Sequence, residues 1–529
     1  MQKRVRTFSL ALAASLVLVA TAGAAEQPKT IKAVMSGALN NLDPIQTTAD
    51  ATLVHGMLVY DTLFSWDENL VAKPQMVDSY TVSDDKLTYT FTLREGLKWH
   101  DGQPVKAEDC VASLQRWSTR DTLGQRIAEL TSDVSVVDGR TFRIVLKAPF
   151  GYLLDALAKT GSNWPIMMPK RLAQTSPSEQ VREAIGSGPF KFVREEWVPG
   201  SKAVYVKNND YVPRDEPASG TAGGKVAKVD RVEWIVMPDQ QTAQAALMNG
   251  EIDLIEAPQA DFIPMLSGTQ GVKVETTATF GIQGILRMNH LQQPFDNAKA
   301  RQGLQALVNQ ETYLRAIVGN PEFYQVCNSI FVCGSPLETQ SKRTYADDKA
   351  RVEAAKQLFK EAGYQGEPIV ILNPTDSALS SSAALVTAQL MREAGLNVDV
   401  QSMDWASVVA RRPNKGKPSE GGWNIFISNQ SGMTASNPLT NLGLAATCEK
   451  AWFGWPCDGK IEALRDKFAS AETLEERRDI AQALQDQADE SVPYISFGQW
   501  SQPIAYRSDR LSNILKLPNS FVFWNIAVK

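Results

Sequence analysis

Four of the five cysteines stand in two close pairs along the chain. Cys327 and Cys333 enclose five residues, and Cys448 and Cys457 enclose eight. Four cysteines allow three pairings, and spacing alone does not choose among them. Because each pair falls within one loop-rich segment, we expect two local disulfides, Cys327–Cys333 and Cys448–Cys457, each contributing about 2–3 kcal/mol to stability. Cys110 is left over, and its neighbours predict a buried, unreactive thiol.

Histidines, the usual general bases and metal ligands, are scarce. The chain has only three, His55, His100 and His290, and none is near a cysteine in sequence. There is no His-Glu-x-x-His, no Gly-x-Ser-x-Gly and no phosphate-binding Gly-x-x-x-x-Gly-Lys-Ser/Thr motif. Residues 186–188 lack the third glycine of a dinucleotide fingerprint and precede a proline, which favours a tight turn. We therefore expect no catalytic residues, no metal site and no cofactor.

The composition is that of a large globular protein with a distinct N-terminal segment. The 529 residues are 43% hydrophobic and 21% charged, so two or three domains are expected. A net charge of −5 argues against a nucleic-acid-binding protein, which normally has a basic excess. Lys3, Arg4 and Arg6 precede an apolar run at 8–20 and small residues at 22–25. We expect residues 1–25 to be a secretory signal peptide and the mature protein to be periplasmic.

The rest of the chain predicts the strands and helices that must position any functional residues. Two-residue alternation predicts a strand at 87–93, and further strands are expected at 142–146, 232–236, 369–372, 396–400 and 423–427. Helices are expected after Pro104, with Val111, Leu114 and Trp117 facing inward, and at 242–248, 382–394 and 460–489. In the second half, this alternation implies right-handed crossovers and a largely parallel sheet.

Eight segments resemble one known family, in the family's order along nearly the whole mature chain. They are residues 58–64, 73–80, 89–94, 98–109, 186–190, 246–253, 294–302 and 354–364. The run at 98–109 reads Lys-Trp-His-Asp-Gly-Gln-Pro-Val-Lys-Ala-Glu-Asp. Together these segments resemble the family 5 solute-binding proteins, which are the dipeptide-, oligopeptide- and nickel-binding components of ABC importers.

The resemblance implies an α/β, two-lobed periplasmic binding protein (type II, cluster C-like) with an extra domain inserted in lobe I. Mapped onto this chain, lobe I is 26–62, 186–285 and 505–529, the inserted domain is 63–185, and lobe II is 286–504. Two chain crossings near 285 and 505 would form the hinge. A cleft between lobes removes the ligand from water, and contacts from both lobes stabilise closure.

The charged anchors of the dipeptide-binding branch are missing where the resemblance places them. In that branch an Asp in the last third of the chain meets the peptide amine, and an Arg upstream of it meets the carboxylate. The corresponding segment 428–438 has no acid, and 373–377 has no base. Because burying an ammonium without an acidic partner is costly, the sequence disfavours a zwitterionic dipeptide.

The ligand-binding candidates come from the same mapping. They are Thr47, Thr48, Trp405, Trp423, Asn429, Gln430, Met433 and Trp455. Trp405 matches a cleft-lining Trp of the dipeptide branch, and Thr47 and Thr48 fall where the first lobe approaches the ligand. Asn429 and Gln430 lie in the segment of the missing Asp. For the Trp residues, core packing is about as frequent as ligand stacking.

We expect a periplasmic substrate-binding component of an ABC importer. It would capture a peptide or peptide-like solute and deliver it to a permease in the inner membrane. We expect a monomer that binds no nucleic acid and catalyses no reaction. The sequence leaves three alternatives: a binder of a non-peptide solute such as a sugar or an opine-like conjugate, a secreted carboxylate hydrolase, and an exported chaperone. Saturable binding without turnover distinguishes the solute binders from the hydrolase.

Overall fold

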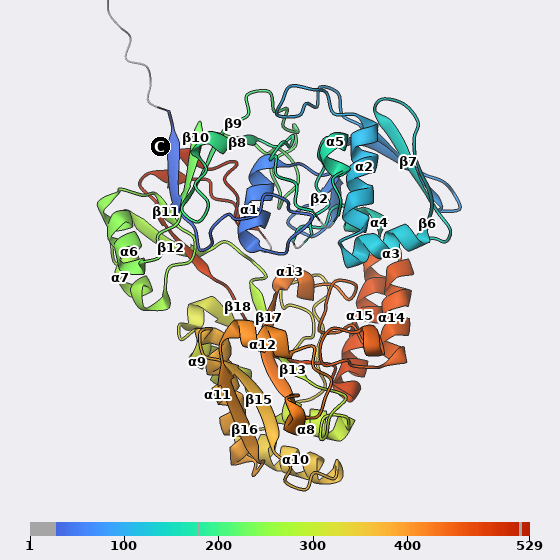
Figure 1. The fold of residues 1–529 in the computed structure, drawn as a ribbon, viewed down its shortest axis with the longest axis vertical. Coiled ribbons are helices and arrows are strands. Elements are labelled where there is room, and N and C mark those ends of the chain that lie inside the picture. The colour runs from blue at the N-terminus through green and yellow to red at the C-terminus, as the bar shows by residue number, and fades with distance from the viewer. Residues whose placement is uncertain (1–27, 162, 178, 518–520) are drawn as a thin grey trace, which may run out of the picture.

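The computed structural model describes residues 28–161, 163–177, 179–517 and 521–529. Figure 1 shows an upper body, which holds the blue to green part of the chain and the red C-terminal segment, and a lower body, which holds the yellow to orange part. The expected signal peptide, residues 1–25, lies outside the described residues. None of the helices in the described part of the chain has the length and apolar character of a membrane span.

The upper body contains a mixed seven-stranded sheet. In spatial order its strands are β12 (Val272–Thr276), β19 (Pro503–Arg507), β11 (Leu254–Ile255), β1 (Thr30–Val34), β10 (Arg231–Ile235), β9 (Lys202–Lys207) and β8 (Phe190–Phe192). β1 runs parallel to β10 and β11, and the other neighbours are antiparallel. The carboxyl ends of β1 and β11 therefore lie at one edge of the sheet. The strand predicted at 232–236 is confirmed as β10.

The upper body also contains a four-stranded antiparallel sheet covered by helices. In spatial order its strands are β4 (Val77–Val82), β5 (Thr88–Leu93), β7 (Thr141–Leu146) and β6 (Thr131–Val136). The neighbouring elements are α2 (Ala107–Ser118), α3 (Thr122–Leu130), α4 (Leu153–Leu157), α5 (Lys170–Ala173) and the hairpin β2 (Phe64–Trp66) and β3 (Ala72–Pro74). The predicted strands at 87–93 and 142–146 are confirmed. α2 begins after Pro104 and buries Val111, Leu114 and Trp117, as predicted.

The lower body is built on a six-stranded sheet. In spatial order its strands are β14 (Tyr324–Gln325), β18 (Ile495–Trp500), β13 (Ile282–Met288), β17 (Ile425–Ser431), β15 (Ile369–Pro374) and β16 (Val398–Met403). The strands predicted in the second half are confirmed as β15, β16 and β17. The expectation of a largely parallel sheet is wrong, because only the two pairs that β15 makes are parallel. β13 begins at the crossing from the upper body and runs away from that body. β17 and β18 run in the opposite direction, so both pair with β13 in antiparallel fashion.

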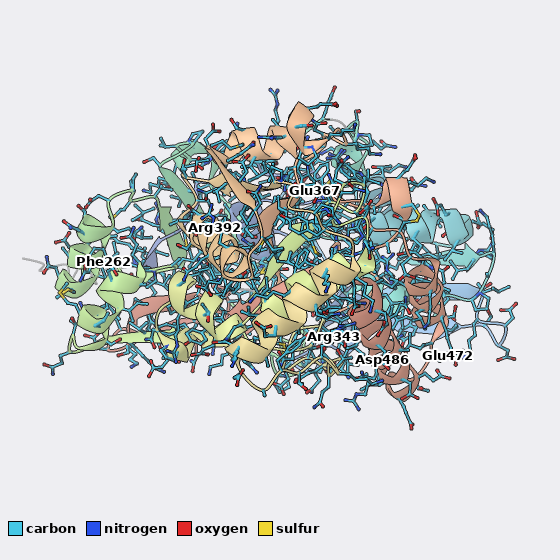
Figure 2. All side chains as sticks on the ribbon, turned by 90° about the horizontal axis from the view of Figure 1, so that it is seen from below. Phe262, Arg343, Glu367, Arg392, Glu472 and Asp486 are labelled. Atoms are coloured by element: carbon cyan, nitrogen blue, oxygen red, sulfur yellow. A yellow bond between two sulfur atoms is a disulfide. The ribbon has the colours of Figure 1, made fainter. Side chains whose placement is uncertain are left out.

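Helices also cover the seven-stranded sheet of the upper body and the six-stranded sheet of the lower body. In the upper body they include α1 (Asp50–Val59), α6 (Gln240–Asn249) and α7 (Ile263–Ser267). In the lower body they are α8 (Ala298–Leu307), α9 (Gln310–Ile317), α10 (Asp348–Glu361), α11 (Ala378–Glu393), α12 (Trp405–Arg411), α13 (Gly432–Ala435), α14 (Gly459–Ser470) and α15 (Leu474–Ser491). The predicted helices are confirmed as α6, α11, and α14 with α15. Asp486, labelled in Figure 2, pairs with Lys342 at 2.6 Å on the charged face of α15.

Short elements complete the chain. They are β20 (Leu511–Ser512), β21 (Ala527–Val528) and the 3-10 turns η1 (Arg194–Glu196), η2 (Ala260–Phe262), η3 (Pro321–Phe323), η4 (Pro418–Glu420) and η5 (Cys448–Lys450). Both expected disulfides, Cys327–Cys333 and Cys448–Cys457, are present in the lower body. Cys110 is a buried free thiol, and burial raises its pKa, so the expectation of an inert thiol is in line with its surroundings.

The chain passes between the two bodies twice. The first crossing joins β12 to β13, and the second joins β18 to β19. The crossings were expected near 285 and 505, and these two segments lie a few residues before those positions. The two crossings touch at Gly281, whose φ is 55°. A Cβ there would collide with the carbonyl oxygen of Trp500, so this position requires glycine on two counts.

Candidate ligand-binding cleft

A cavity of about 400 Å³ lies where the two bodies meet. From the upper body it is lined by residues that follow β1 and β11 and by the start of α1. From the lower body it is lined by the carboxyl end of β17 and by α13, and both crossings complete the wall. In open α/β sheets, ligands bind at the carboxyl ends of the strands, where helix N-termini and loops leave room. This cavity has that placement in both bodies.

Two carboxylates from the upper body face the cavity. Asp50 is the first residue of α1, and Glu256 directly follows β11. Glu256 Oε2 accepts hydrogen bonds from the backbone N–H of Ser36 at 2.8 Å and from its hydroxyl at 2.6 Å. Burial raises the pKa of Glu256, the Ser36 hydrogen bonds oppose the shift, and the charge of Asp50 adds to it. Partial removal from water raises the pKa of Asp50 as well, although the cavity leaves its carboxylate open to solvent.

A buried amide network forms the lower wall. Gln430 Nε2 donates to Gln283 Oε1 at 3.0 Å and to Asn441 Oδ1 at 3.1 Å. Tyr494 supports both partners: its hydroxyl accepts from Asn441 Nδ2 at 3.1 Å and donates to the carbonyl oxygen of Ile330 at 2.7 Å, and that oxygen also accepts from Gln283 Nε2 at 3.3 Å. Turning the Gln430 amide over would set its oxygen against two other oxygens. The network therefore leaves Gln430 Oε1 as a buried acceptor with no partner among the described residues.

The cleft continues away from the crossings. A second cavity, of about 540 Å³, lies between α3 and residues 439–466, and Leu442 lines both cavities. Figure 1 shows α3 above α14 on this side of the molecule. Arg126 of α3 and Asp466 of α14 form an ion pair across the gap at 2.6 Å. The space shared by the bodies is therefore elongated rather than a single round pocket.

Other polar contacts join the bodies beside the cleft. Asn437 Nδ2 donates to the Tyr152 hydroxyl at 2.7 Å. Arg477 of α15 donates to Asp155 Oδ2 at 3.1 Å and to the carbonyl oxygen of Gly151 at 3.0 Å. These residues come from α4 and its approach in the upper body and from α15 and the loop after α13 in the lower body. The contacts exist only while the two bodies are together.

Three of the eight candidate residues line the 400 Å³ cavity. Thr48, Asn429 and Gln430 are among its lining residues. Thr47 is next to Thr48, and its Oγ1 accepts a hydrogen bond from the backbone N–H of Ala49 at 3.2 Å. Met433 is on α13 but is buried in the core, outside the cavity lining. The assignment of these residues to ligand contacts stays a prediction.

The three candidate Trp residues gather elsewhere in the lower body, outside the lining of this cavity. Trp423 is fully buried, and its Nε1 donates to the carbonyl oxygen of Arg412 at 3.1 Å. The rings of Trp423 and Trp455 lie 6.0 Å apart. Trp405 begins α12 and is half-buried, with the Arg412 guanidinium 5.5 Å from its ring centroid. In this arrangement Trp423 and Trp455 pack the core, and Trp405 keeps an open face.

The histidines are dispersed: His55 is fully buried, and His100 and His290 are half-buried. His55 Nδ1 lies 3.0 Å from the Tyr205 hydroxyl, and burial lowers its pKa to about 3. His100 Nε2 lies 3.0 Å from the carbonyl oxygen of Gly188, and burial lowers its pKa to about 4. Across the described residues, no three His, Cys, Asp or Glu side chains are grouped so that they could hold a metal ion.

Comparison with known proteins agrees with this two-body geometry. The model of the bacterial extracellular solute-binding proteins, family 5, matches residues 71–453. The chain belongs to this family. It is 44% identical to a Sinorhizobium fredii protein named "Probable peptide ABC transporter periplasmic-binding protein" over 97% of this chain and 95% of that one. It is 25% identical to the glutathione-binding protein of Salmonella paratyphi A over 77% of this chain and 75% of that one.

A solved structure of an ABC transporter substrate-binding protein from Listeria monocytogenes has the same fold. The TM-score is 0.75 at 20% identity, with 95% of this chain and 99% of that one covered. The family 5 protein described here is thus an extracellular solute-binding protein with the two-lobed periplasmic-binding-protein architecture. The expected family and fold class are confirmed.

Sequence reasoning missed the two cavity acids. It sought an acidic anchor only in the segment after the Trp423 strand, where the dipeptide branch carries it. Glu256 is separated from the motif at 246–253 by the short strand β11, which was not predicted. An acid at the carboxyl end of a strand was the available signal. For Asp50, two positions after Thr48, the sequence held no comparable signal, because its approach to Glu256 depends on tertiary packing.

Proposed function

We propose that this protein captures a peptide or peptide-like solute in the periplasm and delivers it to an ABC permease in the inner membrane. The observation that carries the proposal is the cavity whose wall both bodies share at the two chain crossings. The family membership and the peptide-transport name of the 44% identical relative support it. The protein acts by binding and release, without covalent chemistry.

We propose a division into lobes that the arrangement of the sheets supports. We assign lobe I to the seven-stranded sheet, the inserted domain to about 63–185, and lobe II to the six-stranded sheet. The hinge is then formed by the crossings between β12 and β13 and between β18 and β19. Rotation about two short adjacent segments opens and closes the cleft without unfolding either sheet.

A ligand screen on the mature protein tests the function. The panel contains dipeptides, tri- to pentapeptides, sugars, opine-like conjugates and nickel chelates. A ligand at 100 times its Kd stabilises the folded state by about 2.7 kcal/mol, which raises the Tm of a chain of this size by a few degrees. We expect stabilisation by peptides. Stabilisation by sugars or opine-like conjugates alone would contradict the peptide assignment and leave solute binding intact.

Export is tested separately. We propose that residues 1–25 are removed and that the mature protein is a periplasmic monomer. N-terminal sequencing of protein from the periplasmic fraction should find a start near Glu26, and light scattering after size exclusion should give the mass of one chain. A start at Met1 or retention in the membrane fraction would contradict cleavage.

A further inference from the structure

Another cavity, of about 370 Å³, lies on the seam between the two bodies, and we call it the seam pocket. From the upper body it is lined by the β2–β3 turn and by α4 with the residues before it. From the lower body it is lined by residues of the segments 336–337, 436–437 and 468–477. It shares no lining residue with the 400 Å³ cavity or the 540 Å³ cavity.

The seam pocket exists only while the two bodies are together. Its wall includes contacts that join them, since Asn437 donates to the Tyr152 hydroxyl and Arg477 donates to the carbonyl oxygen of Gly151. The main chains also meet there, because a Cβ on Gly151 would lie 2.8 Å from the carbonyl oxygen of Ala471. A protein that binds in this pocket therefore distinguishes the closed arrangement from an open one.

Each body exposes an apolar side chain at the seam pocket. Val71, in the turn before β3, is 48% exposed, and Leu474, the first residue of α15, is 47% exposed. Both positions are fixed by local hydrogen bonds, because Asp67 Oδ1 accepts from the backbone N–H of Val71 at 2.9 Å and Thr473 caps α15. Apolar surface gathered at one place on a soluble protein marks an interaction site. The other large hydrophobic side chains of the lining are Trp66, Leu70, Leu154, Leu337 and Phe468.

The surroundings of the seam pocket are acidic. Among its described lining residues and their neighbours in the chain, acids outnumber bases by seven to four. Arg477 pairs with Asp155, which leaves Glu472, labelled in Figure 2, as an exposed and unbalanced charge of the described lining. Apolar surface within an acidic surround suits a partner segment that presents an apolar side chain beside a Lys or Arg.

We propose that the ABC permease docks at the seam pocket, through a periplasmic segment that carries an apolar side chain next to a basic one. The inference rests on the proposed solute-binding function and adds the surface by which the loaded protein is recognised. Val71 and Leu474 contact the segment from opposite bodies, and Glu472 attracts its basic residue. Because both bodies build the pocket, separation of the bodies breaks the docking contact.

The test separates docking from ligand binding. Val71→Asp and Leu474→Asp each place a charge at the apolar part of the pocket, one from each body, and Glu472→Lys reverses the charge of the lining. Kd is measured by calorimetric titration of the mature protein with the tightest-binding solute of the screen panel. Uptake of the same solute, labelled with tritium, is measured in cells of the source bacterium in which the variant replaces its own copy of the gene.

Matched controls change residues of similar exposure outside the pocket lining. Val137→Asp is the control in the inserted domain, where Val137 is 56% exposed, and Leu385→Asp is the control in the lower body, where Leu385 is 51% exposed. Glu251→Lys, at another exposed acid, is the control for charge reversal. A photoreactive p-benzoylphenylalanine at position 71, compared with one at position 137, captures the neighbouring protein, which mass spectrometry identifies.

We expect uptake to fall about tenfold or more for Val71→Asp and for Leu474→Asp, with Kd within twofold of wild type. Glu472→Lys should lower uptake less, since a charge at the edge of an interface acts mainly on the association rate. The three controls should keep uptake within twofold. Position 71 should crosslink to a permease subunit, more strongly when the solute is present, and position 137 should not.

Four outcomes would overturn the docking site. They are unchanged uptake in both Asp variants, a Kd that rises in step with the loss of uptake, capture of a second copy of this chain at position 71, and capture of no permease subunit there. If wild type imports a sugar or an opine-like conjugate and no peptide, the peptide assignment fails, and uptake of that solute by the same variants decides the docking site. If wild type imports no solute that it binds, the import function fails and the docking site with it.

Discussion

Arg477 joins the two bodies beside the cleft without lining the 400 Å³ cavity. Its guanidinium donates to Asp155 Oδ2 at 3.1 Å and to the carbonyl oxygen of Gly151 at 3.0 Å, and it lies 5.2 Å from the centroid of the Tyr152 ring. All three partners belong to the upper body, whereas Arg477 is on α15. Arg477→Ala should therefore weaken ligand binding by favouring the open arrangement, although Arg477 does not contact the ligand.

The free energy that Arg477 contributes to the closed arrangement can be worked out from its contacts. A hydrogen bond to a charged partner contributes about 1.5–3 kcal/mol. The Arg477 and Asp155 side chains are each 16% exposed, and burial raises the pKa of Asp155 against the lowering effect of Arg477, so the lower end applies. A loss of about 1.4 kcal/mol is tenfold in an equilibrium constant. If the free protein is mostly open and the ligand binds only the closed arrangement, the whole loss appears in Kd.

The assay is calorimetric titration of the wild type, Arg477→Ala and Arg478→Ala with the tightest peptide from the screen. Arg478 is the matched control, because it is the next residue of α15 and donates to the carbonyl oxygen of Pro336 at 3.0 Å within the lower body. We expect Kd to rise about tenfold for Arg477→Ala and to stay within twofold for Arg478→Ala. A Kd within twofold of wild type for Arg477→Ala, or an equal rise in both variants, would refute the reasoning.

Three further predictions concern the ligand face, a disulfide and pH. Trp405→Ala tests whether bound ligand reaches α12, outside the lining of the 400 Å³ cavity: ligand binding should weaken with little change in Tm, and unchanged affinity removes Trp405 from the site. Replacing Cys448 and Cys457 by Ser should lower the free energy of unfolding in urea by about 2–3 kcal/mol, and an unchanged value would show that this link does not constrain the unfolded chain. Burial lowers the pKa of His55 to about 3 and of His100 to about 4, below the ordinary value of 6.5. As pH falls, these histidines therefore bind protons in the unfolded chain before they do so in the folded protein. Their contribution to stability is present above pH 6.5 and should be lost as pH falls toward 4; urea midpoints should be lower at pH 5 than at pH 7, and His55→Gln should reduce that difference.

Local patterns predicted most of the regular elements. The strand at 87–93 and the helix after Pro104 could be predicted because one face of each must be buried. Apolar residues therefore recur along the chain with the period of the strand or of the helix. The direction of the central strand β13 could not be predicted, because its sequence is compatible with either neighbour order. Its antiparallel pairing follows from where the preceding crossing delivers the chain, and local periodicity does not contain that information.

The amino-acid sequence by itself determined the family and the likeness to a two-lobed binder, since these depend on motifs. It favoured the two local disulfides, because the paired cysteines are near each other along the chain, and the structure shows both. Only the tertiary structure decided which side chains share the cleft. Asp50, Glu256 and Gln430 are far apart in sequence, and they line one cavity because three separate strand and helix ends meet where the bodies approach. The Trp residues show the converse: aromatic character marked Trp423 and Trp455 as candidates for ligand stacking, whereas packing against each other buries both in the lower body.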